Sequence, residues 1–243
     1  MRAWWAQTRA EVAMTLRRGE TLLLTVGIPV VLLLFFSGVR VTATPTAHRV
    51  DFVAPGILAL CVLSTSLVAL SIATGFERSY GVLRRLHATP LGRPRLIGAK
   101  MAGVGATEVI QVAVLSGVAA ALGWHPRGGS LGTLEVVGVL VLASAGCAGI
   151  GLALAGRLRA EVNLAAANGL YLILLLFSGI VVPATSFPGA VQRVATALPS
   201  GAMAEGLHRV LGSGSAPTGG DWICLGVWAL VAPLVAARTF SFD

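Results

Sequence analysis

The chain has 243 residues, of which 56% are hydrophobic and only 12% are charged. A soluble domain of this length carries about 25% charged residues, so the composition excludes that class and predicts an all-α integral membrane protein. The net charge of +8 could indicate a nucleic-acid partner, but the basic residues flank apolar runs, so we interpret them as a topology signal and expect no nucleic acid.

Residues 1–19 precede the first apolar run and contain Trp4 and Trp5. On a helical wheel Trp5 and Val12 share one side, whereas Glu11 falls on another. This pattern predicts an N-terminal amphipathic helix that lies in the headgroup layer, with a frayed polar tail as the alternative. A secretory signal fits less well, because the following run exceeds the usual 7 to 15 residues.

Six apolar runs follow, and we predict that each spans the membrane. They cover residues 21–39, 52–76, 101–122, 134–155, 162–182 and 222–237. Most approach or exceed the ~20 residues that a bilayer core requires. The last run measures only ~24 Å at 1.5 Å per residue, and we expect Trp222 and Arg238 to compensate at the interfaces.

The segments that flank and join these runs differ in how many basic residues they carry. If the N-terminus is cytoplasmic, 13 of the 18 basic residues fall on the cytoplasmic side. Lys/Arg-rich connections stay on that side, so we expect a multi-pass protein with both termini cytoplasmic. The scarcity of lysine beside abundant Ala, Gly, Val and Arg favours a GC-rich bacterial genome, and we therefore expect the membrane to be a bacterial cytoplasmic membrane.

The segment 77–100 carries six of these basic residues between the second and third runs. Val82, Leu83 and Leu86 recur at helical spacing, and Pro90 forbids continuation of the helix. We therefore predict a short amphipathic cytoplasmic helix followed by a loop, a surface on which a cytoplasmic machine would act. An ordinary basic loop that only satisfies topology is the alternative.

The segment 183–220 lies before the last run and is interrupted by prolines, including Pro188 and Pro199. Two apolar stripes follow them: Val191, Val194 and Leu198, then Met203, Leu207, Val210 and Leu211. We predict two short helices that re-enter the outer leaflet, because an exposed loop rarely carries paired stripes.

Two features lie inside the spans. Glu108 is an acid in the third run, and we favour a hydrogen bond within the bundle over a proton relay, since the spans offer no clear second acid. Glu135 lies near the outer boundary of the fourth run, where an interfacial position explains it. In the fourth run Ala143, Cys147, Gly151 and Ala155 recur every four residues, which favours close helix packing within the chain over packing across a dimer.

Catalytic motifs are missing from the sequence. There is no GxxxxGK[ST] phosphate loop, no HExxH and no GxSxG, and the cysteines and histidines lack metal-ligand spacing. We expect no catalytic residue, no bound metal and no cofactor. An intramembrane protease ranks well below a transporter, because no serine in a span has a histidine or an acid at a spacing that suggests a catalytic pair.

One segment resembles a known family. The set Glu77, Arg78, Gly81, Leu83, Leu86, Thr89, Pro90 and Leu91 is similar to the signature loop of the permease subunits of type-2 ATP-binding-cassette (ABC) exporters. These permeases also have six spans, an N-terminal interfacial helix and a Pro-rich outer segment. The resemblance implies a single transmembrane domain over residues 1–243, with residues 77–91 as the ATPase-coupling surface and the region of Pro188 and Pro199 as an outer cap.

The resemblance also implies partners. A separate ABC ATPase subunit would use ATP and Mg, a second permease subunit would complete a homo- or heterodimer, and membrane lipid would surround the spans. The chain is then not an enzyme but the permease of an exporter or efflux pump for an amphipathic or lipid-like compound or drug. A permease for haem or cell-envelope components is one alternative. A secondary transporter is the other, although it requires coupling-ion residues and inverted repeats that we do not find.

Overall fold

The computed structural model describes residues 2–17, 19–39, 49–87, 92–180 and 188–240. In these residues every regular element is a helix, and five helices are long and apolar enough to cross a membrane. They cover Arg49–Ser79, Pro94–Ala121, Gly129–Ala155, Ala160–Phe177 and Gly219–Thr239, and a shorter apolar helix covers Thr25–Gly38. The prediction of an all-α membrane protein with about six spans is confirmed.

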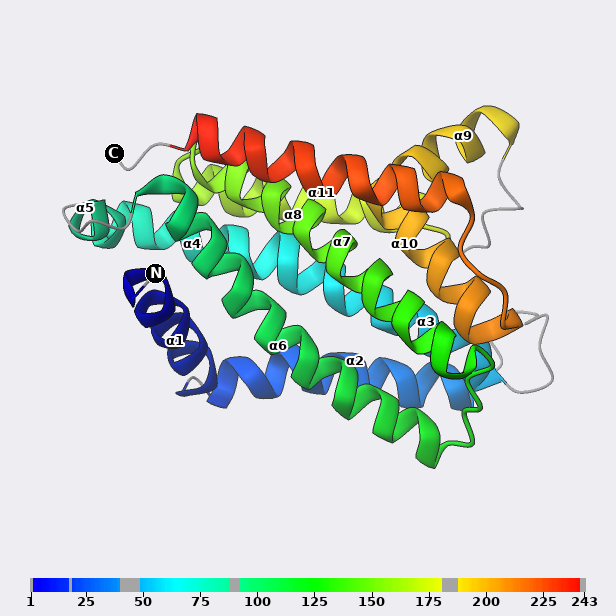
Figure 1. Cartoon of the computed structure of the whole chain (residues 1–243). Coiled ribbons are helices and arrows are strands. Elements are labelled where there is room, and N and C mark those ends of the chain that lie inside the picture. Colours follow the sequence, from blue (N-terminus) through cyan, green and yellow to red (C-terminus); the bar gives the residue numbers. More distant parts are fainter. Residues whose placement is uncertain (1, 18, 40–48, 88–91, 181–187, 241–243) are drawn as a thin grey trace.

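The helices pack into one bundle (Figure 1). In chain order they are α1 (Arg2–Arg17), α2 (Gly19–Gly38), α3 (Arg49–Val62), η1 (Leu63–Ala69), α4 (Leu70–Ser79), α5 (Val82–His87), α6 (Arg93–Ala121), α7 (Gly129–Ala155), α8 (Ala160–Phe177), α9 (Gly189–Ala197), α10 (Pro199–Leu207), η3 (His208–Ser213) and α11 (Gly219–Thr239). α1, α5 and the last turn of α11 lie at one end of the bundle, which we call the terminal end, and α9 and α10 lie toward the other (Figure 1).

A proline inside α2 is compensated by a neighbouring helix. Pro29 lacks the N–H that would bond the carbonyl of Thr25 four residues earlier. Gln111 of α6 donates to that carbonyl from Nε2 at 3.0 Å, and its Oε1 accepts from the hydroxyl of Thr65 at 3.1 Å. Because a bilayer offers no water to free backbone groups, Gln111 satisfies α2 and links it to α6 and η1.

The second span is one continuous helix, α3–η1–α4, with a π-helical stretch at Leu63–Ala69. α7 crosses this stretch closely, because a Cβ at Gly151 would lie 2.6 Å from the carbonyl oxygen of Leu67. The two helices meet through backbone there, and only glycine fits.

The small-residue stripe of the fourth span packs within the chain, as predicted. Ala143, Cys147, Gly151 and Ala155 are all buried. On the adjoining face a Cβ at Gly149 would overlap the backbone of Pro233 in α11. α7 therefore occupies the centre of the bundle, between η1 and α11.

Several predicted span boundaries shift. The third span was predicted to begin at Met101, but α6 begins at Arg93, because Pro94 stands in the first turn, where a missing N–H costs nothing. The fifth was predicted to reach residue 182, but α8 ends at Phe177, where the Ser178 hydroxyl donates to Leu175 O at 2.6 Å and Gly179 adopts a φ of +76°.

The last span is longer than predicted. Thr218 and Asp221 form a capping box, in which the Asp221 N–H donates to Thr218 Oγ1 at 3.2 Å and the Thr218 N–H donates to Asp221 Oδ2 at 2.8 Å. The cap starts α11 at Gly219, so the helix has 21 residues and a length of ~32 Å. The expected shortfall disappears, because a polar cap was left outside the apolar run.

The segment before α11 forms the two predicted short helices, with Pro188 as the N-cap of α9 and Pro199 in the first turn of α10. The second predicted stripe is confirmed, because Met203, Leu207, Val210 and Leu211 are buried. In the first predicted stripe Val194 is 53% exposed, and Ala195 is the residue of α9 that is buried.

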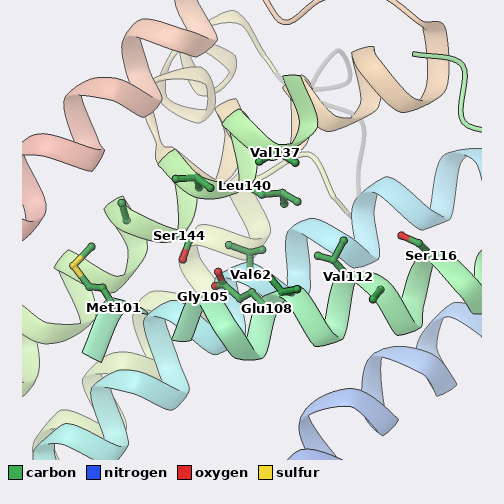
Figure 2. Close-up of a pocket in the computed structure, with 13 residues that line it drawn as sticks. Val62, Met101, Gly105, Glu108, Val112, Ser116, Val137, Leu140 and Ser144 are labelled. Carbon is green, nitrogen blue, oxygen red and sulfur yellow. The ribbon is translucent and has the colours of Figure 1, made fainter. Parts of the chain in front are cut away.

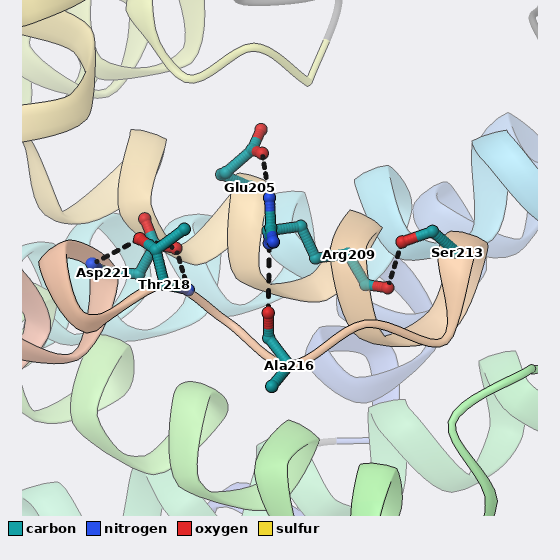
Figure 3. A network of polar contacts seen from close by, with 6 residues as sticks. All are labelled: Glu205, Arg209, Ser213, Ala216, Thr218 and Asp221. Atoms are coloured by element: carbon teal, nitrogen blue, oxygen red, sulfur yellow. Dashed lines mark hydrogen bonds and ion pairs between the residues drawn. The ribbon is translucent and has the colours of Figure 1, made fainter.

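A polar network ties this region together (Figure 3). The Arg209 guanidinium donates from Nε to Ala216 O at 3.0 Å and approaches Glu205 at 3.9 Å, while the Ser213 hydroxyl donates to Arg209 O at 2.7 Å. Together with the α11 cap, these contacts hold the turn between η3 and α11 in one conformation.

Candidate functional site

The terminal end of the bundle holds most of the predicted coupling residues. Glu77 and Arg78 stand in the last turn of α4, and Gly81 follows with a φ of +72°, which reverses the chain into α5. A side chain with a Cβ would be strained at that φ. Glycine at 81 thus decides the direction in which α5 leaves the bundle.

Glu77 joins a buried ion cluster. Lys100 of α6 is only 2% exposed, and its ammonium lies 2.5 Å from Glu77 Oε2 and 3.2 Å from Glu11 Oε1 of α1. α1 and α6 are in close contact beside it, because a Cβ at Gly103 would lie 2.9 Å from the Cβ of Glu11. One ammonium therefore holds α1, α4 and α6 together.

Sequence reasoning placed Lys100 in the basic segment but missed its pairing with Glu11. The available signal was that Lys100 is the only lysine among 18 basic residues. An ammonium is a compact charge with three rotatable donors, and it serves carboxylates arriving from different directions better than the planar fork of arginine.

Arg78 follows Glu77 in the same turn of α4, but it contacts a different helix and caps the C-terminus of α7. Its guanidinium donates to Ala155 O at 2.9 Å and to Leu158 O at 3.0 Å. A cation at a helix C-terminus satisfies free carbonyls and complements the helix dipole. The Glu77–Arg78 pair thus connects the start of α5 to α1 and α6 on one side and to α7 on the other.

α5 has a buried face and an exposed one. Leu83 is fully buried in a cluster with Leu96, Leu152 and Phe240. Tyr80 is 73% exposed and Val82 39%, and Arg84 and Arg85 are exposed as well.

The other predicted coupling residues are less completely placed. Leu86 belongs to α5, and its side chain is not described; Thr89, Pro90 and Leu91 lie outside the described residues. Leu83 therefore anchors α5 to the bundle, and the exposed residues that the structure describes in and beside this helix are Tyr80, Val82, Arg84 and Arg85.

A second polar contact lies inside the bundle, where α4 meets α8. Asn163 is fully buried, accepts from the Ser71 hydroxyl at 2.9 Å and donates to Ser71 O at 2.8 Å. The second span, which ends at the predicted coupling residues, is thereby held to the fifth span through hydrogen bonds made within the chain.

Glu108 faces a pocket between α6 and α7 (Figure 2). The residue is 7% exposed, and its Oε1 is buried without a hydrogen-bond partner. The expected hydrogen bond within the bundle is therefore not made at this atom. Ser144 of α7 points toward the carboxyl group across the pocket (Figure 2).

Five long apolar helices, a shorter sixth and a charged surface at the terminal end define a multi-pass helical membrane protein in which the short helix α5 lies outside the spans. The family model described as ABC-2 type transporter matches residues 2–211. The chain belongs to the ABC-2 type transporter family, as its resemblance to these permeases predicted. A search of curated proteins finds no match.

Proposed function

We propose that this ABC-2 type permease is one half of an ATP-driven exporter whose ATPase is a separate subunit. The ATPase, with ATP and Mg, docks at the cytoplasm on the exposed face of α5. A second permease, identical or related, completes the path, and an amphipathic or lipid-like compound or drug leaves the cell through it. Both termini are cytoplasmic, because the terminal end carries most of the basic residues.

The observation that carries the proposal is the connection of α5 to three other helices. A push on Tyr80 or Arg84 reaches Glu77 and Arg78 through the turn at Gly81. Glu77 pairs with Lys100 of α6, which also pairs with Glu11 of α1, and Arg78 donates to the Ala155 carbonyl of α7. Because the contacts are buried or part-buried ion pairs and charged hydrogen bonds, α5 cannot shift far without moving those helices. ATPase closure would thereby rock the spans.

Co-purification from the native membrane tests the proposal. The tagged chain is extracted in mild detergent, and the variant Arg84→Glu with Arg85→Glu is compared with Arg193→Glu, an exposed arginine of α9 at the other end. We expect a stoichiometric ATPase with the wild type and with the α9 variant, and loss of that ATPase with the α5 variant.

Leu83 and Glu77 are unsuitable targets, because changing either would disturb the bundle itself. A wild-type chain that purifies without an ATPase in every detergent would contradict the proposal. It would favour a secondary transporter instead.

A further inference from the structure

The pocket between α6 and α7 is large and almost entirely apolar. It has a volume of about 530 Å³ and extends along α6 from Met101 to Ser116, a distance of ~22 Å at 1.5 Å per residue. This volume falls within the range of sites that hold drug-sized molecules. It therefore accommodates a long apolar body lying parallel to the helix.

The pocket opens sideways. Val109 of α6 is 68% exposed, and Val137 and Val141 of α7 are 50% and 60% exposed, and all three line the pocket. Apolar side chains exposed on spanning helices face lipid in a membrane protein. A ligand would thus enter from the bilayer and not from the water at either end.

Glu108 is the acidic residue in this pocket. Its position, 14 residues beyond Pro94 in a 28-residue span, is midway along the helix. No basic side chain lines the pocket among the residues that the structure describes. A carboxyl group at this depth costs a few kcal/mol, and its Oε1 lacks a donor. A ligand that carries a positive charge and donates a hydrogen bond would satisfy this oxygen.

We propose that this pocket binds a monocationic amphiphile, whose ammonium N–H donates to Glu108 Oε1 while its apolar tail lies along the valines of α6 and α7. The site deepens the proposed function, because it names the chemical class of compound taken up from the bilayer. The proposed site depends on the proposed function only for the step in which the bound compound is transported onward. Binding itself requires neither the ATPase nor a second permease.

Equilibrium binding to the full chain in phosphatidylcholine nanodiscs tests the site. Radiolabelled dodecylamine is the cationic probe and dodecanol is its neutral counterpart, with empty nanodiscs subtracted as the lipid background. The wild type should bind dodecylamine saturably, and at least tenfold more tightly than dodecanol. Glu108→Gln keeps the shape of the side chain and should weaken dodecylamine at least tenfold, with dodecanol unchanged.

A second variant tests the pocket itself. A Cβ at Gly105 meets no atom within 4 Å, and Gly105 lines the pocket, so Gly105→Leu fills the space without a clash. It should abolish the binding of both probes. Gly117→Leu is the matched control, since Gly117 is also unobstructed, lies on the same helix and is exposed outside the lining. It should bind both probes like the wild type.

Three results would overturn the proposal: no saturable dodecylamine binding by the wild type, equal affinity for the amine and the alcohol, or undiminished amine affinity in Glu108→Gln. A thermal unfolding scan of each variant establishes that it is folded. Loss of this site would leave ATPase co-purification unchanged, so the two proposals fail separately.

Discussion

Lys100→Met would release α1 from the bundle. Lys100 is buried and pairs with Glu77 at 2.5 Å and with Glu11 at 3.2 Å. Methionine fills a similar volume and suits a helix, so the change removes the charge while leaving the packing nearly intact. The two carboxylates would lose the cation that they share, and without that attraction α1 would move away from α6 more readily.

The size of the effect follows from burial. Removing one partner of a fully buried ion pair costs about 3 to 5 kcal/mol. The side chains of Glu11 and Glu77 retain 14% and 28% exposure, so water recovers part of the loss, and we expect about 2 to 3 kcal/mol. At 1.4 kcal/mol per factor of ten, the opening equilibrium of α1 would rise ~30- to 150-fold.

Hydrogen exchange of the full chain in lipid nanodiscs measures this opening. The amides of α1 should exchange ~30- to 150-fold faster in Lys100→Met, whereas those of α7 should keep their rates. Adding Glu11→Gln and Glu77→Gln should restore much of the protection. Unchanged α1 exchange, or an equal increase in the exposed control Arg85→Met, would refute the reasoning.

Three further changes act on buried contacts, and each is followed by thermal unfolding in detergent. Arg78→Gln removes the cap of α7 and should destabilise the fold by about 1.5 to 3 kcal/mol, less if Lys is introduced instead. Gly149→Ala forces a Cβ into the backbone of α11 and should cost about 1 to 3 kcal/mol of stability. The control Gly105→Ala should be neutral or stabilising. Equal losses of stability in the two variants would contradict the close packing of α7 on α11. Gln111→Leu removes the hydrogen bonds that Gln111 makes to the Thr25 carbonyl of α2 and with the buried Thr65 hydroxyl, at a cost of about 1 to 3 kcal/mol. A variant as stable as the wild type would show that these two hydrogen bonds do not stabilise the fold.

The boundaries of the elements show where sequence patterns stop being sufficient. Apolar runs marked the spans, because the lack of water in a bilayer makes hydrophobicity a local requirement. Helix ends depend instead on capping residues. These are polar, so a hydropathy pattern assigns them to the loop. Thr218 and Asp221 extend α11 beyond its apolar run, and Gly179 with Ser178 ends α8 before its run does.

The candidate sites divide in the same way. The basic segment, its short helix and the acid at Glu108 were visible in the sequence, because charges beside or within apolar runs are conspicuous. Their roles within the bundle were not. Leu83 was predicted as part of the coupling surface but is fully buried, and Lys100 was counted with the basic residues but is an internal ion-pair partner.

The sequence by itself determined the class of the protein, its approximate spans and its family, because these follow from hydropathy, charge placement and one motif read along the chain. Only the tertiary structure decided that Glu11 meets Lys100 across 89 residues of sequence and that Glu108 faces a pocket with its Oε1 left without a hydrogen-bond partner. The physical reason is that the sequence does not fix the rotation of each helix about its own axis. A helix that is apolar on every side has no period that marks its inward face, so its neighbours decide which side chains meet.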